Sequence, residues 1–171
     1  MERMGFWVVR TGSRERNFTV ADACWRRGVI AVSWSDWFDG DLREKSRRRL
    51  EEDLRAWHSD ASAGTIGNHR HQLHSFLEEM TIGDVVISPD WRDSRLMVGT
   101  IKGGYEYLSD SCIGSGGLVF RHIRPIDWQI KIRKDRLSSA EQRSLDTPMT
   151  IYRPKQTHTL ERLLAEWIVD Y

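Results

Sequence analysis

Three β-rich segments follow one another in the second half of this chain, and they restrict the possible folds more than any other feature. They are residues 83–90 (GDVVISPD), 95–108 (RLMVGTIKGGYEYL) and 118–132 (LVFRHIRPIDWQIKI). Each is rich in β-branched and aromatic residues, and the connections carry turn residues such as glycine. Because short connections join antiparallel neighbours, we expect these segments to pair as antiparallel strands of one sheet.

The first 35 residues predict a strand, a helix and a second strand. Residues 5–12 (GFWVVRTG) alternate as a strand does, and residues 29–35 (VIAVSWS) form another β-rich run. Between them, residues 17–28 space their apolar side chains as a helix does, and Gly28 stands where a helix ends. This β-α-β-like start, packed on the antiparallel set, predicts an α+β fold whose mixed sheet closes into a small barrel.

The remaining segments predict helices that flank the sheet. Residues 41–58 are highly charged around a narrow apolar stripe, with Asp41 near the N-cap, as is typical of a surface helix. We expect a polar loop at 59–68, helices at 69–80, 138–145 and 158–170, and a brief strand at 149–153. One domain over residues 1–171 is expected, with a core at about 5–137 and a helical extension at 138–171.

The overall charge argues against a general polyanion binder. The net charge is +1, so any nucleic-acid surface must be local. The chain has two distant cysteines and no apolar signal-peptide region. No window reaches the run of about 18 apolar residues that spans a bilayer. We therefore expect a soluble, cytoplasmic protein with no membrane partner.

Four motifs stand in a specific order: the strand–helix–strand start at 6–35, GDVVI at 83–87, VGTIKGGYEY at 98–107 and FRHIRPIDW at 120–128. This order resembles the PUA-like domains, specifically their EVE and YTH branch. It is also similar to the N-terminal modules of Mrr-type restriction nucleases. The resemblance implies a PUA-like pseudo-barrel that reads nucleic acid without catalysis or cofactor and holds a flipped, often modified base in an aromatic pocket.

Aromatic residues near glycines and hydroxyl side chains support such a pocket, because a flipped base is held by stacking and by hydrogen bonds to its edge. The resemblance implies that Ser33, Trp34 and Ser35 line the pocket and that Ser13 faces it. The remaining candidates are the aromatic side chains Trp37, Trp91, Tyr105 and Tyr107, and we expect Arg10, Arg14 and Arg16 to bind phosphates beside the pocket.

Gly103 and Gly104 interrupt a strand directly before two of these tyrosines. Glycine within a strand pattern indicates a bulge or a close approach by another group. Our hypothesis is that the approaching group is a nucleotide; a plain bulge is the alternative.

Several alternatives stay open. Core packing is the alternative for Trp34, and plain sheet packing is the alternative for Tyr105 and Tyr107. A salt-bridged surface helix explains Arg47, Arg48 and Arg49 better than a basic patch does. Asp127 and Lys131 resemble part of an Mg²⁺-dependent nuclease site, which would need a second acid. His71 and His74 share a helical face that could bind a metal, but no acid or thiolate stands at a supporting spacing. The leading hypothesis is a reader of DNA or RNA bearing a modified base, acting with a nuclease partner in restriction or defence; a protein-interaction subunit is the third candidate.

Overall fold

The computed structural model describes residues 4–13, 18–33, 40–114 and 119–169, and of Ser13, Phe18 and residues 167–169 it describes the backbone alone. Its strands are β1 Phe6–Val9, β2 Gly12–Ser13, β3 Phe18–Thr19, β4 Val29–Val32, β5 Val85–Asp90, β6 Arg95–Ile101, β7 Glu106–Tyr107, β8 His122–Arg133 and β9 Ile151–Tyr152. The main sheet has the order β4-β8-β6-β5-β1-β9, and β7 pairs with β8 beside this path. β2 and β3 form a separate hairpin.

The main sheet is mixed. β1 and β5 run parallel, whereas β5, β6 and β8 pair antiparallel in succession. This confirms the antiparallel pairing expected for the three β-rich segments.

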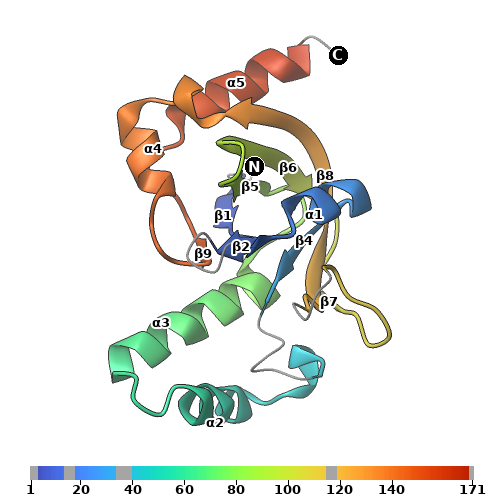
Figure 1. Cartoon of the computed structure of the whole chain (residues 1–171), viewed down its shortest axis with the longest axis vertical. Helices are drawn as coiled ribbons and strands as arrows, with labels where there is room; N and C mark the ends of the chain where they lie inside the picture. The colour runs from blue at the N-terminus through green and yellow to red at the C-terminus, as the bar shows by residue number, and fades with distance from the viewer. Residues whose placement is uncertain (1–3, 14–17, 34–39, 115–118, 170–171) are drawn as a thin grey trace.

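The long strand β8 curls the sheet. Its first four residues pair with β4, and residues from Ile126 onward pair with β6. Figure 1 shows β8, in orange, arching around the other strands. The sheet therefore forms a curled half-barrel with flanking helices, and the α+β pseudo-barrel prediction is confirmed.

The helices are α1 Ala21–Arg27, α2 Arg47–Trp57, α3 Ala63–His74, a π-helical turn η2 Ser75–Glu79, α4 Ser139–Leu145 and α5 His158–Val169, with short 3₁₀ turns η1 Leu42–Glu44 and η3 Lys134–Arg136. α2 and α3 lie below the half-barrel in Figure 1, and α4 and α5 lie on the opposite side. Gly28 ends α1 with φ of 64°, a left-handed conformation that favours glycine, as the sequence predicted.

Serine caps explain where the helix boundaries depart from expectation. The helix predicted over 41–58 begins only at Arg47, because the Ser46 side chain accepts a hydrogen bond from Arg49 N. The loop predicted over 59–68 is wrong: the Ser62 side chain accepts from Thr65 N and starts α3.

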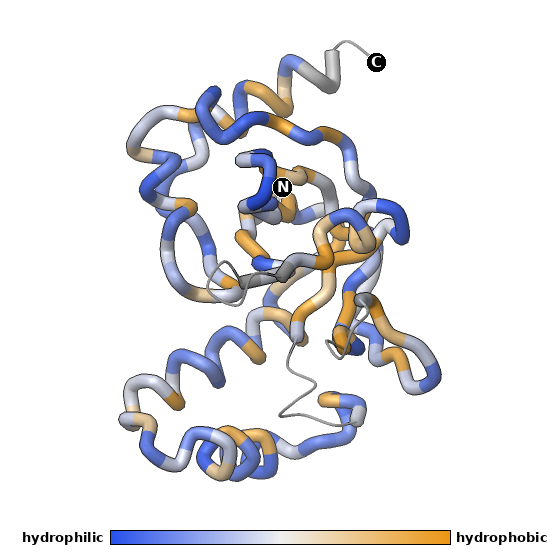
Figure 2. The backbone as a smooth tube through the Cα atoms, viewed as in Figure 1, coloured by the Kyte–Doolittle hydropathy of each residue, from blue (hydrophilic) through white to orange (hydrophobic). Residues whose placement is uncertain are grey.

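Apolar side chains cover both faces of the sheet. Trp7 and Val9 pack with Phe76 of η2 on one face, and Val8 packs on the other with Leu160 of α5. Figure 2 shows the hydrophobic colours gathered in the central strands, while α2 and α3 carry long hydrophilic stretches. Strands buried on both faces read as continuous apolar runs, which is the pattern of β1 and β5.

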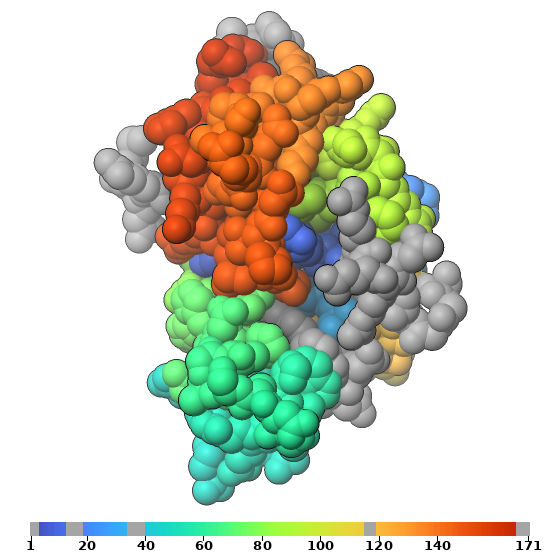
Figure 3. All heavy atoms as spheres, turned by 60° about the vertical axis from the view of Figure 1, so that its left-hand side comes forward, coloured from blue at the N-terminus to red at the C-terminus, as the bar shows by residue number. Residues whose placement is uncertain are grey.

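The segment predicted as a helical extension belongs to this packing. β9 pairs antiparallel with β1, and Leu145 and Leu164 are buried in the same cluster as Val8. Figure 3 shows the orange and red atoms of this segment covering the upper half of the visible face, directly above α3. Among the described helices, none is both long and apolar enough to cross a bilayer.

Candidate functional site

The Asp84 carboxylate of the GDVVI motif ties the N-terminal strand to the turn before β5. It accepts hydrogen bonds from Gly5 N at 2.7 Å, from Trp7 Nε1 at 2.9 Å and from Thr81 N at 3.0 Å. Burial alone would raise the pKa of Asp84, but the bonds from Thr81, Trp7 and Gly5 outweigh it and hold the pKa below its usual value. The role of this motif residue is architectural.

Arg124, within FRHIRPIDW, is buried beneath η2. Its guanidinium donates to Phe76 O at 2.6 Å, to Leu77 O at 2.9 Å and to Gly103 O at 3.3 Å. It thereby satisfies carbonyls that the end of a helix leaves without partners. In the same motif, Trp128 Nε1 donates to carbonyl oxygens at the end of α1 and the start of β4.

Tyr105, His122 and Tyr107 form an aromatic group, here called the Tyr–His cluster. The Tyr105 hydroxyl lies 2.8 Å from His122 Nδ1, and the two rings stack with centroids 5.9 Å apart. The Tyr107 ring lies 5.4 Å from the His122 ring. His122 was not among the site residues predicted from the sequence, although its place in the FRHIRPIDW motif was an available signal.

The Tyr–His cluster holds the chain where it returns from β4. Gly40 N donates to the Tyr107 hydroxyl at 3.1 Å, and Leu42 N donates to the Tyr105 hydroxyl at 3.2 Å. The pairing register places Val32 opposite His122, and His122 opposite Tyr107. The chain therefore leaves β4 one strand away from His122 and comes back onto the two tyrosine hydroxyls.

Tyr105 is not an open pocket wall, which corrects the prediction. It is 5% exposed and packs edge-on against Phe76. Burial raises the pKa of its hydroxyl above the usual tyrosine value, so the group stays protonated as a hydrogen-bonding group. Tyr107 is only partly buried and packs against the core.

Trp91 does not share a hollow with the tyrosines. It lies in the turn before β6, whereas Tyr105 and Tyr107 follow β6, which has seven residues. A strand of that length separates its ends by about 20 Å, more than one nucleobase can bridge. The Arg92 guanidinium lies 5.4 Å from the Trp91 ring centroid. The single pocket predicted from all five aromatic residues is therefore corrected.

Gly103 approaches the protein itself. A Cβ on Gly103 would lie 2.9 Å from Cγ of Pro125, whereas a Cβ on Gly104 would meet nothing within 4 Å. The close approach predicted from the sequence exists at Gly103, but the approaching group is Pro125 and not a nucleotide.

Arg10 serves the fold. Its guanidinium donates to Leu145 O, at the end of α4, at 3.0 Å. Phosphate binding by Arg10 stays a prediction. Arg14 and Arg16 lie outside the described residues, as do Trp34, Ser35 and Trp37, together with the side chain of Ser13. Ser33 is described at the end of β4 and is partly buried.

The residues of the nuclease alternative do not gather into a site. Lys131 Nζ lies 3.5 Å from Asp22 Oδ1 and 4.8 Å from the Trp25 ring centroid, on the α1 side of the sheet. Asp127 is exposed on β8, opposite Thr100. Within the described ranges, no three His, Cys, Asp or Glu side chains come together as metal ligands, and this includes His71 and His74.

Comparison with known proteins gives a fold neighbour and a family. The chain is similar to the YTH domain of the Zygosaccharomyces rouxii MRB1 protein in complex with N6-methyladenosine RNA, with 11% identity, a TM-score of 0.48, and coverage of 97% of this chain and 88% of that chain. No curated protein matches the sequence. Residues 7–155 match a family model described as "Domain of unknown function (DUF8426)", and the chain belongs to that family.

Proposed function

We propose that this protein is a non-catalytic reader that binds single-stranded nucleic acid and holds one unpaired, modified base beside the Tyr–His cluster. The proposed pocket combines Tyr107 with the segment that joins Ser33 to Gly40, which carries Trp34, Ser35 and Trp37. Tyr105 supports this pocket from the core, and Trp91 is left out of it.

One observation carries the proposal: the described residues on either side of the segment with both tryptophans, Val32 and Gly40, lie next to the Tyr–His cluster. The segment leaves β4 beside His122, and it returns where Gly40 N donates to the Tyr107 hydroxyl. A rigid anchor at both ends suits a binding loop, because the scaffold then limits the entropy lost when the loop binds a ligand.

Stacking supplies the affinity in this proposal. A base taken out of its stack costs a few kcal/mol, which stacking on aromatic rings and hydrogen bonds to the base edge recover. The half-buried Tyr107 ring and two indoles in one short segment offer such rings. The proposal leaves any strand cleavage to a separate nuclease partner, in a restriction or defence setting.

The test measures binding of labelled single-stranded oligonucleotides, DNA and RNA, with one base either methylated or unmodified, at two salt concentrations. Trp34→Ala and Trp37→Ala should each lower affinity by about 1–3 kcal/mol, the usual contribution of one stacked base. Trp91→Ala is the matched control and should bind as the wild type does, because it lies at the other end of β6.

Two results would contradict the proposal. One is equal loss of affinity in Trp91→Ala and Trp34→Ala. The other is binding that depends strongly on salt but not on the modification, which would indicate phosphate contact alone. Mg²⁺-dependent cleavage of plasmid by the purified protein, lost in Asp127→Asn, would instead favour the nuclease alternative.

A further inference from the structure

A hollow lies between α3 and the segment formed by η1 and the start of α2. Its volume is about 530 Å³, within the range of small-ligand pockets. The described residues that line it are Leu42, Arg43, Lys45, Arg47, Leu50, Gly67, Arg70, His71, Leu73, His74, Leu77 and Glu78. Four permanent cations therefore face one carboxylate around this cavity.

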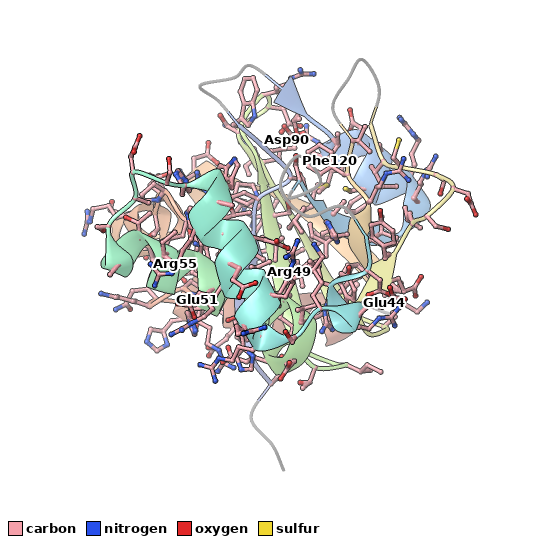
Figure 4. All side chains as sticks on the ribbon, turned by 90° about the horizontal axis from the view of Figure 1, so that it is seen from below. Glu44, Arg49, Glu51, Arg55, Asp90 and Phe120 are labelled. Atoms are coloured by element: carbon pink, nitrogen blue, oxygen red, sulfur yellow. The ribbon has the colours of Figure 1, made fainter. Side chains whose placement is uncertain are left out.

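Three of these cations already have acidic partners. Arg43 pairs with Asp41, Lys45 Nζ lies 2.8 Å from Asp53 Oδ2, and Arg70 Nη1 lies 3.3 Å from Glu51 Oε2. Figure 4 labels Glu51 and Arg55, which form a further ion pair along α2 at 2.9 Å. These pairs shape the rim and cancel part of its charge.

Arg47 is the exception among the lining cations. Within the described part of the chain it has neither an acidic partner nor a side-chain hydrogen bond, and it is exposed. The next two residues differ: Arg48 lies 3.5 Å from Glu52, and Arg49 lies 3.1 Å from Asp53. The predicted salt-bridged surface helix therefore accounts for Arg48 and Arg49. It does not account for Arg47, which lines the cavity without an acidic partner among the described residues.

The position of Arg47 in its helix strengthens the attraction for an anion. It is the first residue of α2, whose first turn carries no acidic residue. The backbone dipole makes a helix start positive, so cations there are normally disfavoured and anions favoured. An anion in the cavity beside Arg47 would offset the charge of the guanidinium and the positive end of the helix dipole.

Part of the cavity wall is aliphatic. Leu42, Leu50, Leu73 and Leu77 contribute apolar surface. At Gly67 a Cβ would meet nothing within 4 Å, so the glycine leaves open space on the α3 side. A ligand that fits these walls has an anionic end and a flat or apolar body.

We propose that this cavity binds a nucleotide, with its phosphate on Arg47 and its nucleoside on the leucine surface. The nucleotide is either free or one unit of a nucleic-acid strand, since both present the same phosphate. The described residues that line this cavity do not include Tyr105, Tyr107 or His122, although Leu42 N donates to the Tyr105 hydroxyl, and the proposal does not depend on the base pocket.

The test compares adjacent arginines of α2 by titration calorimetry. The intact protein is titrated with adenosine monophosphate, adenosine, inorganic phosphate and an unmodified tetranucleotide. Arg47→Gln should weaken binding of the monophosphate, or of the tetranucleotide if the strand is the source, about 10-fold, the loss of one charged hydrogen bond. Arg48→Gln, which removes a neighbouring cation paired with Glu52, should leave the affinity unchanged.

Proton NMR places the ligand. The imidazole signals of His71 and His74, which line the cavity, should shift with the bound nucleotide, and the signal of His158 on α5 should not. The proposal is overturned if neither the monophosphate nor the tetranucleotide binds, if Arg47→Gln and Arg48→Gln behave alike, or if adenosine or inorganic phosphate binds as tightly as the monophosphate. Trp34 is not among the described residues that line this cavity, so Trp34→Ala should keep the Arg47-dependent binding even if the reader proposal fails.

Discussion

Replacing Asp84 with alanine tests whether the Gly-Asp motif is architectural. The change removes the acceptor of three hydrogen bonds, from Gly5 N, Trp7 Nε1 and Thr81 N. Trp7 is 1% exposed, so its indole N–H loses its acceptor without gaining water. An unsatisfied buried donor costs about 1–3 kcal/mol, and each of the two partly buried bonds contributes about 0.5–1.5 kcal/mol.

The expected loss for Asp84→Ala is therefore about 4 kcal/mol in the free energy of unfolding, a large part of the 5–15 kcal/mol typical of a domain. Urea unfolding followed by tryptophan fluorescence measures it. Asp127→Asn is the control, because Asp127 is an exposed carboxylate on the same sheet, and its expected change is within about 0.5 kcal/mol. Equal stability of the Asp84→Ala variant and the wild type would refute the architectural role.

The same carboxylate predicts a dependence on pH. The folded pKa of Asp84 is below its usual value, so the unfolded state binds the proton more tightly. The stabilisation is complete above the usual aspartate pKa of about 4 and is lost as the pH falls through the folded value. Unfolding midpoints from pH 7 down to pH 3 should fall more steeply for the wild type than for Asp84→Asn; parallel curves would contradict the assignment.

Two further pairs of residues give matched tests. Gly103→Ala should destabilise the protein by about 1–3 kcal/mol by forcing its Cβ onto Pro125, whereas Gly104→Ala should be neutral or slightly stabilising in the same urea titration; equal effects would refute the close contact. Burial raises the pKa of the Cys24 thiol to about 12, while Cys112 is only partly buried, so a thiol reagent at pH 8 should modify Cys112 alone until the protein unfolds. Rapid reaction of both thiols in the native state would contradict the burial of Cys24.

Local sequence signals predicted the elements better than their boundaries. The helix end predicted at Gly28 is confirmed by its left-handed backbone, because a helix end depends on residues close together in the sequence. The start of α3 was missed, because Gly64 and Gly67 indicate a loop while the Ser62 cap favours a helix. The packing of α3 on α2 outweighs the poor helix propensity of its glycines.

The candidate site was less predictable. The sequence marks Trp91, Tyr105 and Tyr107 as aromatic residues near glycines, but it does not say at which end of a strand each will lie. In the structure, strand β6 lies between Trp91 and the two tyrosines and holds them apart. The cavity beside Arg47 was missed for a similar reason, since its walls come from α3 as well as α2.

The sequence alone determined the α+β class, the succession of the three β-rich segments and the small net charge, because these follow from local patterns and composition. The tertiary structure alone decided that Asp84 and Arg124 hold the framework, that Tyr105 is core, and that Arg47 is left without an acidic partner among the described residues. The physical reason is that each of these roles depends on groups distant in sequence: 77 residues separate Asp84 from Trp7, and 48 separate Arg124 from Phe76. The first contact forms only when β1 pairs with β5, and the second only when β8 brings Arg124 against η2.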